Sequence, residues 1–168
     1  MSEEEFMSQL DHLQTYLYRI ALALLGNDAD ANDALQDACL RAYLARAKQR
    51  GGAASFRPWI KSILLHVCCD MLKHRQRVIT MGAPEEVYGQ VRQSEAPPEE
   101  SLVWDHVADL PTELREIVAL RYLFDLTQEQ AARALQIPIG TVKSRLNRAL
   151  RILRAELMTV RRGEDCAL

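Results

Sequence analysis

The sequence predicts an all-α protein made of two small helical domains joined by a flexible linker. Three observations support this. Apolar residues recur at steps of three and four in two separate blocks, which is the period of amphipathic helices. Ala, Leu, Arg, Glu and Gln dominate while Val, Ile and Thr are sparse, which favours helix over strand. A polar stretch separates the two blocks. We expect domains at 1–78 and 101–162, a linker at 79–100 and a tail at 163–168.

The first two helices are predicted from their apolar stripes. The first stripe comprises Phe6, Leu10, Leu13, Leu17, Ile20 and Leu24. Gly26-Asn27 should end that helix, and Asp28 can cap the next one. The second helix has an inner face of mostly small residues, which allow close packing: Ala31, Ala34, Leu35, Ala38 and Ala42.

A third helix should follow the loop at 49–52, with Ser55 as its cap. Its apolar residues are Trp59, Ile60, Ile63, Leu64, Val67, Met71 and Leu72. It runs into the basic segment 73–77. Three amphipathic helices with short connections predict an antiparallel three-helix unit.

The second domain is expected to begin after the Pro-, Gly- and Glu-containing linker. A short helix near Glu99 would place Leu102, Val103 and Val107 inward. Pro111 suits the first turn of the following helix. That helix contributes Leu114, Ile117, Val118 and Leu120 to the core.

The segment from Thr127 to about Met158 predicts a helix-turn-helix. Thr127 and Gln130 form a capping-box pattern, the turn spans 136–139, and the second helix begins around Pro138 to Thr141. Its apolar side contains Val142, Leu146, Ala149, Leu150, Leu153 and Leu157. Its polar side contains Ser144, Asn147, Arg148, Arg151 and Arg154, flanked by Lys143 and Arg145. Such a helix suits the DNA major groove, although a plain helical hairpin with a solvated basic face is the alternative.

The near-neutral charge hides strong segregation. Residues 1–40 have one base against eight acids, whereas 41–77 have nine bases against one acid. A second basic block spans 141–162, with seven bases against one acid. Two basic blocks suggest two contacts with a polyanion, and the acidic parts suggest a protein partner or self-masking. Solvated helix faces are the alternative for either block alone.

Several classes are disfavoured. The sequence has no long apolar run and no N-terminal targeting pattern, so we expect a cytoplasmic protein. The four cysteines lack metal-ligand spacing, and we expect Cys39 and Cys68 to pack as small apolar groups. Paired catalytic carboxylates, a Cys/His pair and a phosphate-binding glycine loop are not found. We therefore expect no enzyme activity, no cofactor, no metal and no small-molecule substrate.

The motifs resemble a known family. The segments Leu126-Thr-Gln-Glu-Gln-Ala-Ala and Gly140-Thr-Val-Lys-Ser-Arg-Leu-Asn-Arg-Ala149 are similar to region 4 of extracytoplasmic-function (ECF) sigma factors. The segments Asp30-Ala-Asn-Asp-Ala-Leu-Gln-Asp-Ala38, Leu40-Arg-Ala-Tyr43, Phe56-Arg-Pro-Trp-Ile60 and Asp70-Met-Leu-Lys-His-Arg75 resemble region 2 of the same family. Both motif sets occur in the family's order, so the resemblance covers most of the chain.

The resemblance implies a sigma factor that is a monomer when free of partners. Region 2 would bind the β′ coiled coil of core RNA polymerase and the −10 element. Region 4 would bind the β flap and the −35 element of promoter DNA, and an anti-sigma factor would inhibit both. The polymerase would be bound by Asp30, Asp33, Gln36 and Asp37. The −10 element would be bound by Trp59, Lys61, His66, Lys73 and Arg75. The −35 element would be bound by Arg121, Thr141, Lys143, Ser144, Asn147, Arg148 and Arg151.

Some positions depart from the family pattern. His66 stands where Asn is usual, so the −10 preference could differ, and an exposed helix histidine without a role is the alternative. Asn147 replaces bulkier residues. Gln136 occupies a helix end where a left-handed non-glycine residue would cost roughly 1 kcal/mol. Trp59 and Trp104 are favoured as core anchors over base-stacking platforms. The rival function is a stand-alone helix-turn-helix regulator that dimerises and binds DNA without polymerase.

Overall fold

The computed structural model describes residues 1–49, 52–80 and 106–165. These ranges are helical, with short turns and no β-strand among them. The chain divides into two compact units, Met1–Gly89 and Gln90–Leu168, which are described separately below. No helix in the described ranges is long and apolar enough to cross a membrane.

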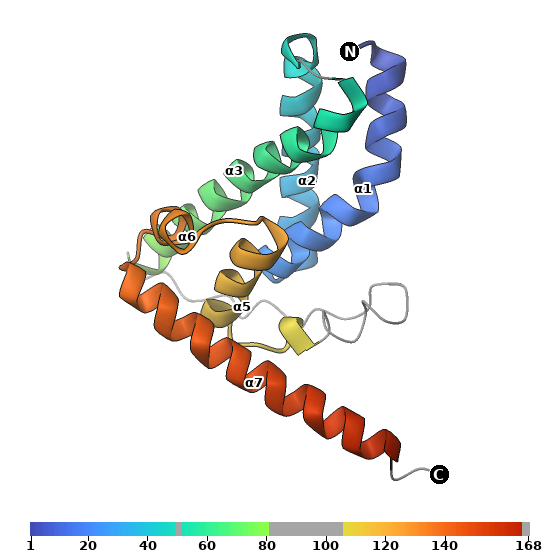
Figure 1. Ribbon diagram of the computed structural model, residues 1–168. Helices are drawn as coiled ribbons and strands as arrows, with labels where there is room; N and C mark the ends of the chain where they lie inside the picture. Colours follow the sequence, from blue (N-terminus) through green and yellow to red (C-terminus); the bar gives the residue numbers. More distant parts are fainter. Residues whose placement is uncertain (50–51, 81–105, 166–168) are drawn as a thin grey trace. The chain divides into compact units, whose positions relative to one another are not determined.

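Unit 1 contains three α-helices that each contact the other two. They are α1 (Glu3–Leu25), α2 (Asp28–Ala45) and α3 (Gly52–Thr80), with a short 3-10 segment η1 (Arg46–Lys48) after α2. Helices α1 and α2 run side by side in opposite directions, and α3 crosses them obliquely (Figure 1). The predicted three-helix unit is confirmed.

The turn between α1 and α2 ends one helix and starts the next within two residues. Gly26 adopts a left-handed conformation (φ 81°), and its N–H donates to the carbonyl of Leu22 at 2.8 Å. Asn27 caps α2, because its side-chain oxygen accepts a hydrogen bond of 2.8 Å from the N–H of Asp30. The prediction that Asp28 is the cap is therefore wrong by one residue, and Asp28 lies in the first helical turn.

The inner faces of α1 and α2 largely match the predicted stripes. All five predicted residues of α2 are buried. Of the α1 stripe, Phe6, Leu17, Ile20 and Leu24 are buried, whereas Leu10 and Leu13 are only half-buried. The small side chains of α2 thus allow α1 and α3 to approach it closely.

Helix α3 begins earlier and ends later than predicted. It starts at Gly52, so Ser55 lies inside the first turn, where its hydroxyl donates to the Gly52 carbonyl at 3.1 Å. Ser55 is therefore not the cap. The helix continues through Thr80, so residues 79 and 80 of the expected linker are helical, and 81–100 fall outside the described ranges. Phe56, which the stripe omitted, is fully buried and packs edge-on against Phe6, with ring centroids 5.5 Å apart.

Unit 2 is built on α5 (Thr112–Val118), a π-helical segment η2 (Ala119–Leu123), α6 (Gln128–Leu135) and α7 (Ile139–Asp165). Residues 106–108 are also helical. Of the short helix expected near Glu99, only Val107 is described, and it is buried as predicted; Leu102, Val103 and Trp104 lie outside the described ranges. The predicted core residues of α5 are buried.

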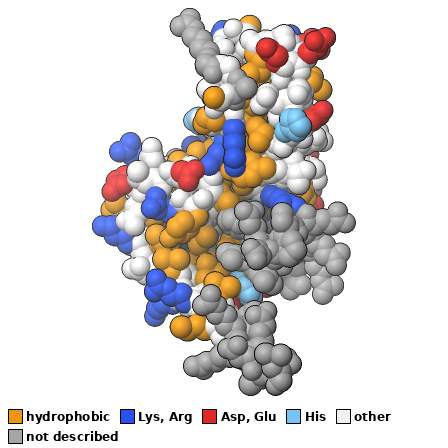
Figure 2. Space-filling model, turned by 45° about the vertical axis from the view of Figure 1, so that its right-hand side comes forward, with side chains coloured by type: hydrophobic (Ala, Val, Ile, Leu, Met, Phe, Trp, Pro, Cys, Tyr) orange, Lys and Arg blue, Asp and Glu red, His pale blue; other side chains and the backbone are white. Residues whose placement is uncertain are grey.

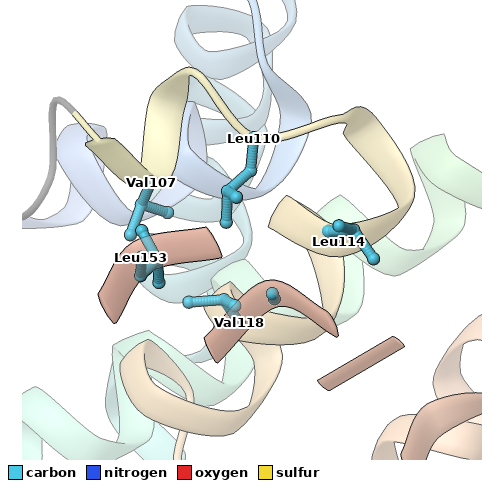
Figure 3. Close-up of a cluster of buried hydrophobic side chains, with 6 residues drawn as sticks. Val107, Leu110, Leu114, Val118 and Leu153 are labelled. Carbon is cyan, nitrogen blue, oxygen red and sulfur yellow. The ribbon is translucent and has the colours of Figure 1, made fainter. Parts of the chain in front are cut away.

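One apolar cluster joins residues 107–118 to the last helix of this unit. Figure 3 shows Val107 and Leu110 lying opposite Leu153 of α7, with Leu114 and Val118 of α5 beside them. Ala149 completes the cluster, and Ile152 packs against it. The cluster therefore holds α7 at its middle, and the opposite side of the helix lies at the surface.

Three features of unit 2 were not predicted. The helix that follows Pro111 becomes π-helical at Ala119, and Asp125 then takes a positive φ of 56°. Helix α7 also extends to Asp165 instead of ending near Met158, so residues 163–165 of the expected tail are helical.

The cysteines pack much as expected. Cys68 is fully buried, Cys69 is nearly so, and Cys39 is half-buried. Burial raises the pKa of the Cys39 and Cys68 thiols. Both therefore remain protonated near neutral pH and fill space as small apolar groups.

Candidate nucleic-acid interface

The helix-turn-helix begins with the predicted capping box. The hydroxyl of Thr127 accepts from the N–H of Gln130 at 3.1 Å, and the Gln130 side-chain oxygen accepts from the N–H of Thr127 at 2.8 Å. The reciprocal bonds satisfy two N–H groups that would otherwise have no partner at the start of α6. Ala131, Ala132 and Leu135 then bury one side of this eight-residue helix.

The turn between α6 and α7 depends on a left-handed residue, as expected. Gln136 has φ 55° and ψ 41°. The next N–H, of Ile137, donates back to the carbonyl of Ala132 at 3.1 Å. The carbonyl of Pro138 then accepts from Thr141 and Val142 at 2.9 and 3.2 Å, which starts α7. Three residues, 136–138, thus connect the two helices.

Burial separates the two sides of α7 as the sequence predicts. Val142, Leu146, Ala149 and Leu153 are buried, and Leu150 and Leu157 are half-buried. Arg145 lies at the boundary, where its guanidinium forms an ion pair of 3.0 Å with Glu113 of α5. This pair and the apolar contacts fix the rotation of α7 about its own axis.

The opposite side of α7 presents hydrogen-bond donors to solvent. Ser144, Asn147, Arg148 and Arg151 are exposed and fall within about a third of the helix circumference. Thr141 is half-buried at the edge of this group, and Lys143 is exposed on its other side. Figure 2 shows Lys and Arg side chains at the surface in blue. The structure therefore brings six of the seven predicted −35 residues onto one region of α7.

The basic groups on this surface are not neutralised within the described chain. Lys143, Arg148, Arg151 and Arg154 form no ion pair with any described residue. Of these four groups, Lys143 acts on the carboxylate of Glu129 in α6. Its pKa lies below the ordinary value, chiefly through backbone and Thr127 hydrogen bonds, with smaller contributions from Lys143 and Arg121. The surface thus presents a positive potential suited to a polyanion.

Arg121, the seventh predicted −35 residue, lies on η2. It is half-buried, and its guanidinium donates to the carbonyl of Leu126 in the loop before α6. This contact holds the loop that leads into the helix-turn-helix. One guanidinium nitrogen is therefore engaged within the protein.

The five predicted −10 residues all lie on α3 but not on one face. Trp59, His66 and Lys73 are separated by seven residues each, which places them along one side of the helix. Lys61 and Arg75 lie roughly opposite. His66 is exposed, whereas Trp59 is half-buried and tilts against Phe56 with ring centroids 5.8 Å apart. Trp59 is thus partly a core residue, as favoured above.

Arg75 faces the interior of unit 1. Its guanidinium lies 2.5 Å from the carboxylate of Asp30 and 3.3 Å from the carbonyl of Leu25. Its side chain is 24% exposed and that of Asp30 is 23% exposed. Two residues assigned by resemblance to different partners are therefore bonded to each other.

The other predicted polymerase residues lie on the outer side of α2. Asp33 and Gln36 are exposed, and Asp37 forms a two-bond ion pair with Arg41 at 2.7 and 2.9 Å. Leu40 and Leu44 are 58% and 71% exposed beside them. The sequence analysis did not select these leucines, although their seven-residue spacing from Asp33 and Asp37 puts them on the same side.

Comparison with known families identifies both units. Residues 10–78 match sigma-70 region 2, and residues 102–153 match sigma-70 region 4. The two matched segments include α6, the turn and the N-terminal half of α7, as well as α2 and nearly all of α3.

Individual relatives agree. The chain is 31% identical to the ECF RNA polymerase sigma factor SigE of Mycolicibacterium smegmatis over 82% of this chain, but spans only 56% of that protein. It is 30% identical to the RNA polymerase sigma-E factor of Streptomyces coelicolor, covering 92% of this chain and 86% of that one. The sigma factor RpoE of Bartonella quintana, solved in complex with the anti-sigma factor NepR, has a similar fold, with a TM-score of 0.61 and 21% identity over 92% of this chain and 98% of that chain.

Proposed function

The chain belongs to the extracytoplasmic-function group of the sigma-70 family, and we propose that it binds core RNA polymerase and directs it to promoters. In this proposal unit 2 recognises the −35 element and unit 1 recognises the −10 element. The observation that supports it most is the exposed, unneutralised basic side of α7, held in a helix-turn-helix by a buried apolar side.

The −35 contact follows from the chemistry of that surface. A helix of this diameter fits the major groove, and its N-terminal residues reach base edges. Arg148 can donate two hydrogen bonds to guanine, and Asn147 can pair with adenine. Lys143, Ser144 and Arg151 would bind phosphates and fix the register. Arg121 and Thr141 would support the same contact from the edge.

The −10 contact uses the exposed side of α3. His66 and Lys73 share this side with the edge of Trp59, so one strand could meet the aromatic edge of Trp59, the ring of His66 and the cation of Lys73 in turn. Asp33, Gln36 and Asp37 of α2 would meet a basic polymerase surface. Opposite charges across such an interface favour association and fix its register.

The protein would contribute specificity and leave the chemistry to the polymerase. Two moderate contacts on one chain reinforce each other, because binding of one raises the local concentration of the other. We place the activity in the cytoplasm, with no cofactor. The Bartonella sigma factor was solved in complex with an anti-sigma factor, and we propose that this chain also has an anti-sigma partner.

The test is run-off transcription with core polymerase on a genomic promoter library. We expect promoter-dependent transcripts only when the protein is added. If the protein instead binds specific DNA as a dimer without polymerase, and polymerase with the protein makes no transcript, the chain is a stand-alone regulator.

Two variants assign the surfaces. Arg148→Ala should weaken discrimination at one −35 position by about 1–3 kcal/mol, whereas Arg154→Ala, farther along the same helix, should spare it. Asp33→Arg should weaken polymerase capture, measured by native gel shift, while Asp11→Arg on exposed α1 should not. Equal effects of Arg148→Ala and Arg154→Ala would mean that Arg148 does not read the −35 element. Equal effects of Asp33→Arg and Asp11→Arg would mean that Asp33 does not bind the polymerase.

A further inference from the structure

The contact between Arg75 and Asp30 joins segments that are far apart in sequence. Arg75 lies near the C-terminal end of α3, and Asp30 lies in the first turn of α2. The guanidinium also donates to the carbonyl of Leu25, the last residue of α1. One side chain therefore binds the end of α1 and the start of α2 together.

The acceptor site for Arg75 is itself ordered. Asn27 is 7% exposed, and its side-chain nitrogen donates to the Asp30 carboxylate at 2.9 Å. Its side-chain oxygen meanwhile caps the N–H of Asp30. Asn27 thus holds both the carboxylate and the backbone N–H of Asp30, independently of Arg75. Charge-assisted bonds to a preset carboxylate are stronger and more directional than neutral ones.

Arg75 lies on the other side of α3 from the side proposed to meet DNA. His66, Lys73 and Arg77 share that outer side, and Arg77 is exposed. The anchor therefore restrains the helix that presents these residues, although it does not share their surface.

We propose that Arg75 and Asp30 are positioning residues that tie the DNA-facing end of α3 to the α1–α2 turn, and are not themselves contacts to DNA or polymerase. The outer faces of α2 and α3 would then be held in one fixed relation. This inference rests on the proposed function only for its DNA and polymerase measurements.

A role of Asp30 through its charge and a role in positioning α3 predict opposite changes in DNA affinity for one substitution. Asp30→Asn removes a negative charge from unit 1. If Asp30 acts only through its charge, this change should tighten binding to single-stranded −10 DNA. If it positions α3, the change should weaken binding, as Arg75→Ala should. Changes of this kind typically shift affinity by about 2- to 30-fold.

The experiment measures binding of a polymerase complex of the full chain to a fluorescent −10 oligonucleotide across a salt series. We expect Asp30→Asn, Arg75→Ala and the double variant to weaken binding to the same extent. The slope of log affinity against log salt concentration should not change. Lys73→Ala is the matched control, and it should lower the slope by about 0.7. A reduced slope in Arg75→Ala, or tighter binding in Asp30→Asn, would overturn the inference.

Unfolding of the isolated chain tests the pair without DNA. Each single variant should raise the unfolding equilibrium constant of unit 1 at least about 10-fold, the lower end of the scale of a hydrogen bond to a charged group, and the double variant should add little further. Additive effects of the two changes would refute the link. If the wild-type complex fails to bind the oligonucleotide, the proposed function fails. The non-additivity of the two variants in unfolding still tests the link between Arg75 and Asp30.

Discussion

His66 has a defined tautomer at the surface of α3. Its Nδ1 lies 2.7 Å from the carbonyl oxygen of Ser62, one helical turn earlier. A carbonyl oxygen only accepts, so Nδ1 must donate its hydrogen. In the neutral ring, Nε2 then bears the free lone pair, and the exposed edge accepts hydrogen bonds instead of donating them.

We predict that neutral His66 presents an acceptor to DNA. A base that offers an exocyclic amino group (adenine, cytosine or guanine) should be preferred over thymine at the −10 position it meets. His66→Asn, whose amide both donates and accepts, should flatten this preference by about 1 kcal/mol.

Nitrogen-15 NMR of the imidazole checks this prediction, with His66→Asn used to assign the signal. A hydrogen on Nε2 in the neutral ring would contradict it, whatever the DNA result. His74, which is exposed on the same helix, allows a matched variant, His74→Asn, that should not change the base preference.

Tyr18 gives unit 1 a dependence on alkaline pH. Partial burial and a hydrogen bond from its hydroxyl to Asp28 raise its pKa to about 12, against about 10 in an unfolded chain. The folded state therefore favours the protonated ring. Its contribution is complete below about pH 10 and is lost as the pH rises toward 12.

Tyr18→Phe should remove this part of the pH dependence. We expect the stability difference between wild type and the variant to shrink from about pH 10 to 12, as measured by denaturant unfolding of unit 1. Tyr122→Phe, exposed in unit 2, is the control and should behave as wild type. A constant difference for Tyr18→Phe would disprove the prediction.

At the residue scale the sequence predicts which side chains are exposed better than it predicts which residues they contact within the protein. It places Ser144, Asn147 and Arg148 on the outer side of α7, because helical periodicity alone decides this. It does not predict that Arg75 reaches Asp30 or that Arg121 holds the Leu126 carbonyl. Those contacts depend on where the chain folds back, and no local pattern encodes that.

At the element scale, the turn of the helix-turn-helix contains a strained residue. Gln136 is left-handed, a conformation that disfavours a side chain with a Cβ atom. Its backbone bonds hold it there, since the N–H of Ile137 needs the Ala132 carbonyl. The stability of α6, the turn and α7 therefore includes this local cost.

We predict that Gln136→Gly stabilises unit 2 by up to about 1 kcal/mol, less the greater flexibility that glycine adds to the unfolded chain. Thermal unfolding monitored by circular dichroism measures it. Arg133→Gly, in the helical part of α6, is the matched control and should destabilise by about 0.5–1 kcal/mol. Destabilisation by both changes would argue against the strain.

Element boundaries were harder to predict than element faces. The apolar stripe of α2 was complete, since small residues on one side leave few alternatives. Ser55 looked like a cap, but Gln49 donates to its hydroxyl at 2.6 Å, and the helix had already begun at Gly52. The π-helical η2 and the extension of α7 have no sequence signal as regular as a cap or a stripe.

At the scale of the whole molecule, two separate cores support two separate surfaces. Phe6, Phe56 and Leu64 anchor unit 1, whereas Leu114 and Leu146 anchor unit 2. Composition and the break in periodicity predicted this division, because each block contains enough apolar residues for its own small core.

Independent units should unfold independently, and a cavity in one core tests this. Leu146 is 7% exposed on the buried side of α7, so Leu146→Ala should lower the stability of unit 2 by about 2–5 kcal/mol. Unit 1 should be unaffected, because no part of its core is removed.

Hydrogen exchange of backbone amides reports both units in one sample: protection should fall in α5–α7 and remain in α1–α3. Leu64→Ala, in the core of α3, should give the reverse pattern. Loss of protection in both units after either change would mean that they fold as one body, and the two promoter contacts could then not be treated as separate binding events reinforced by a shared chain.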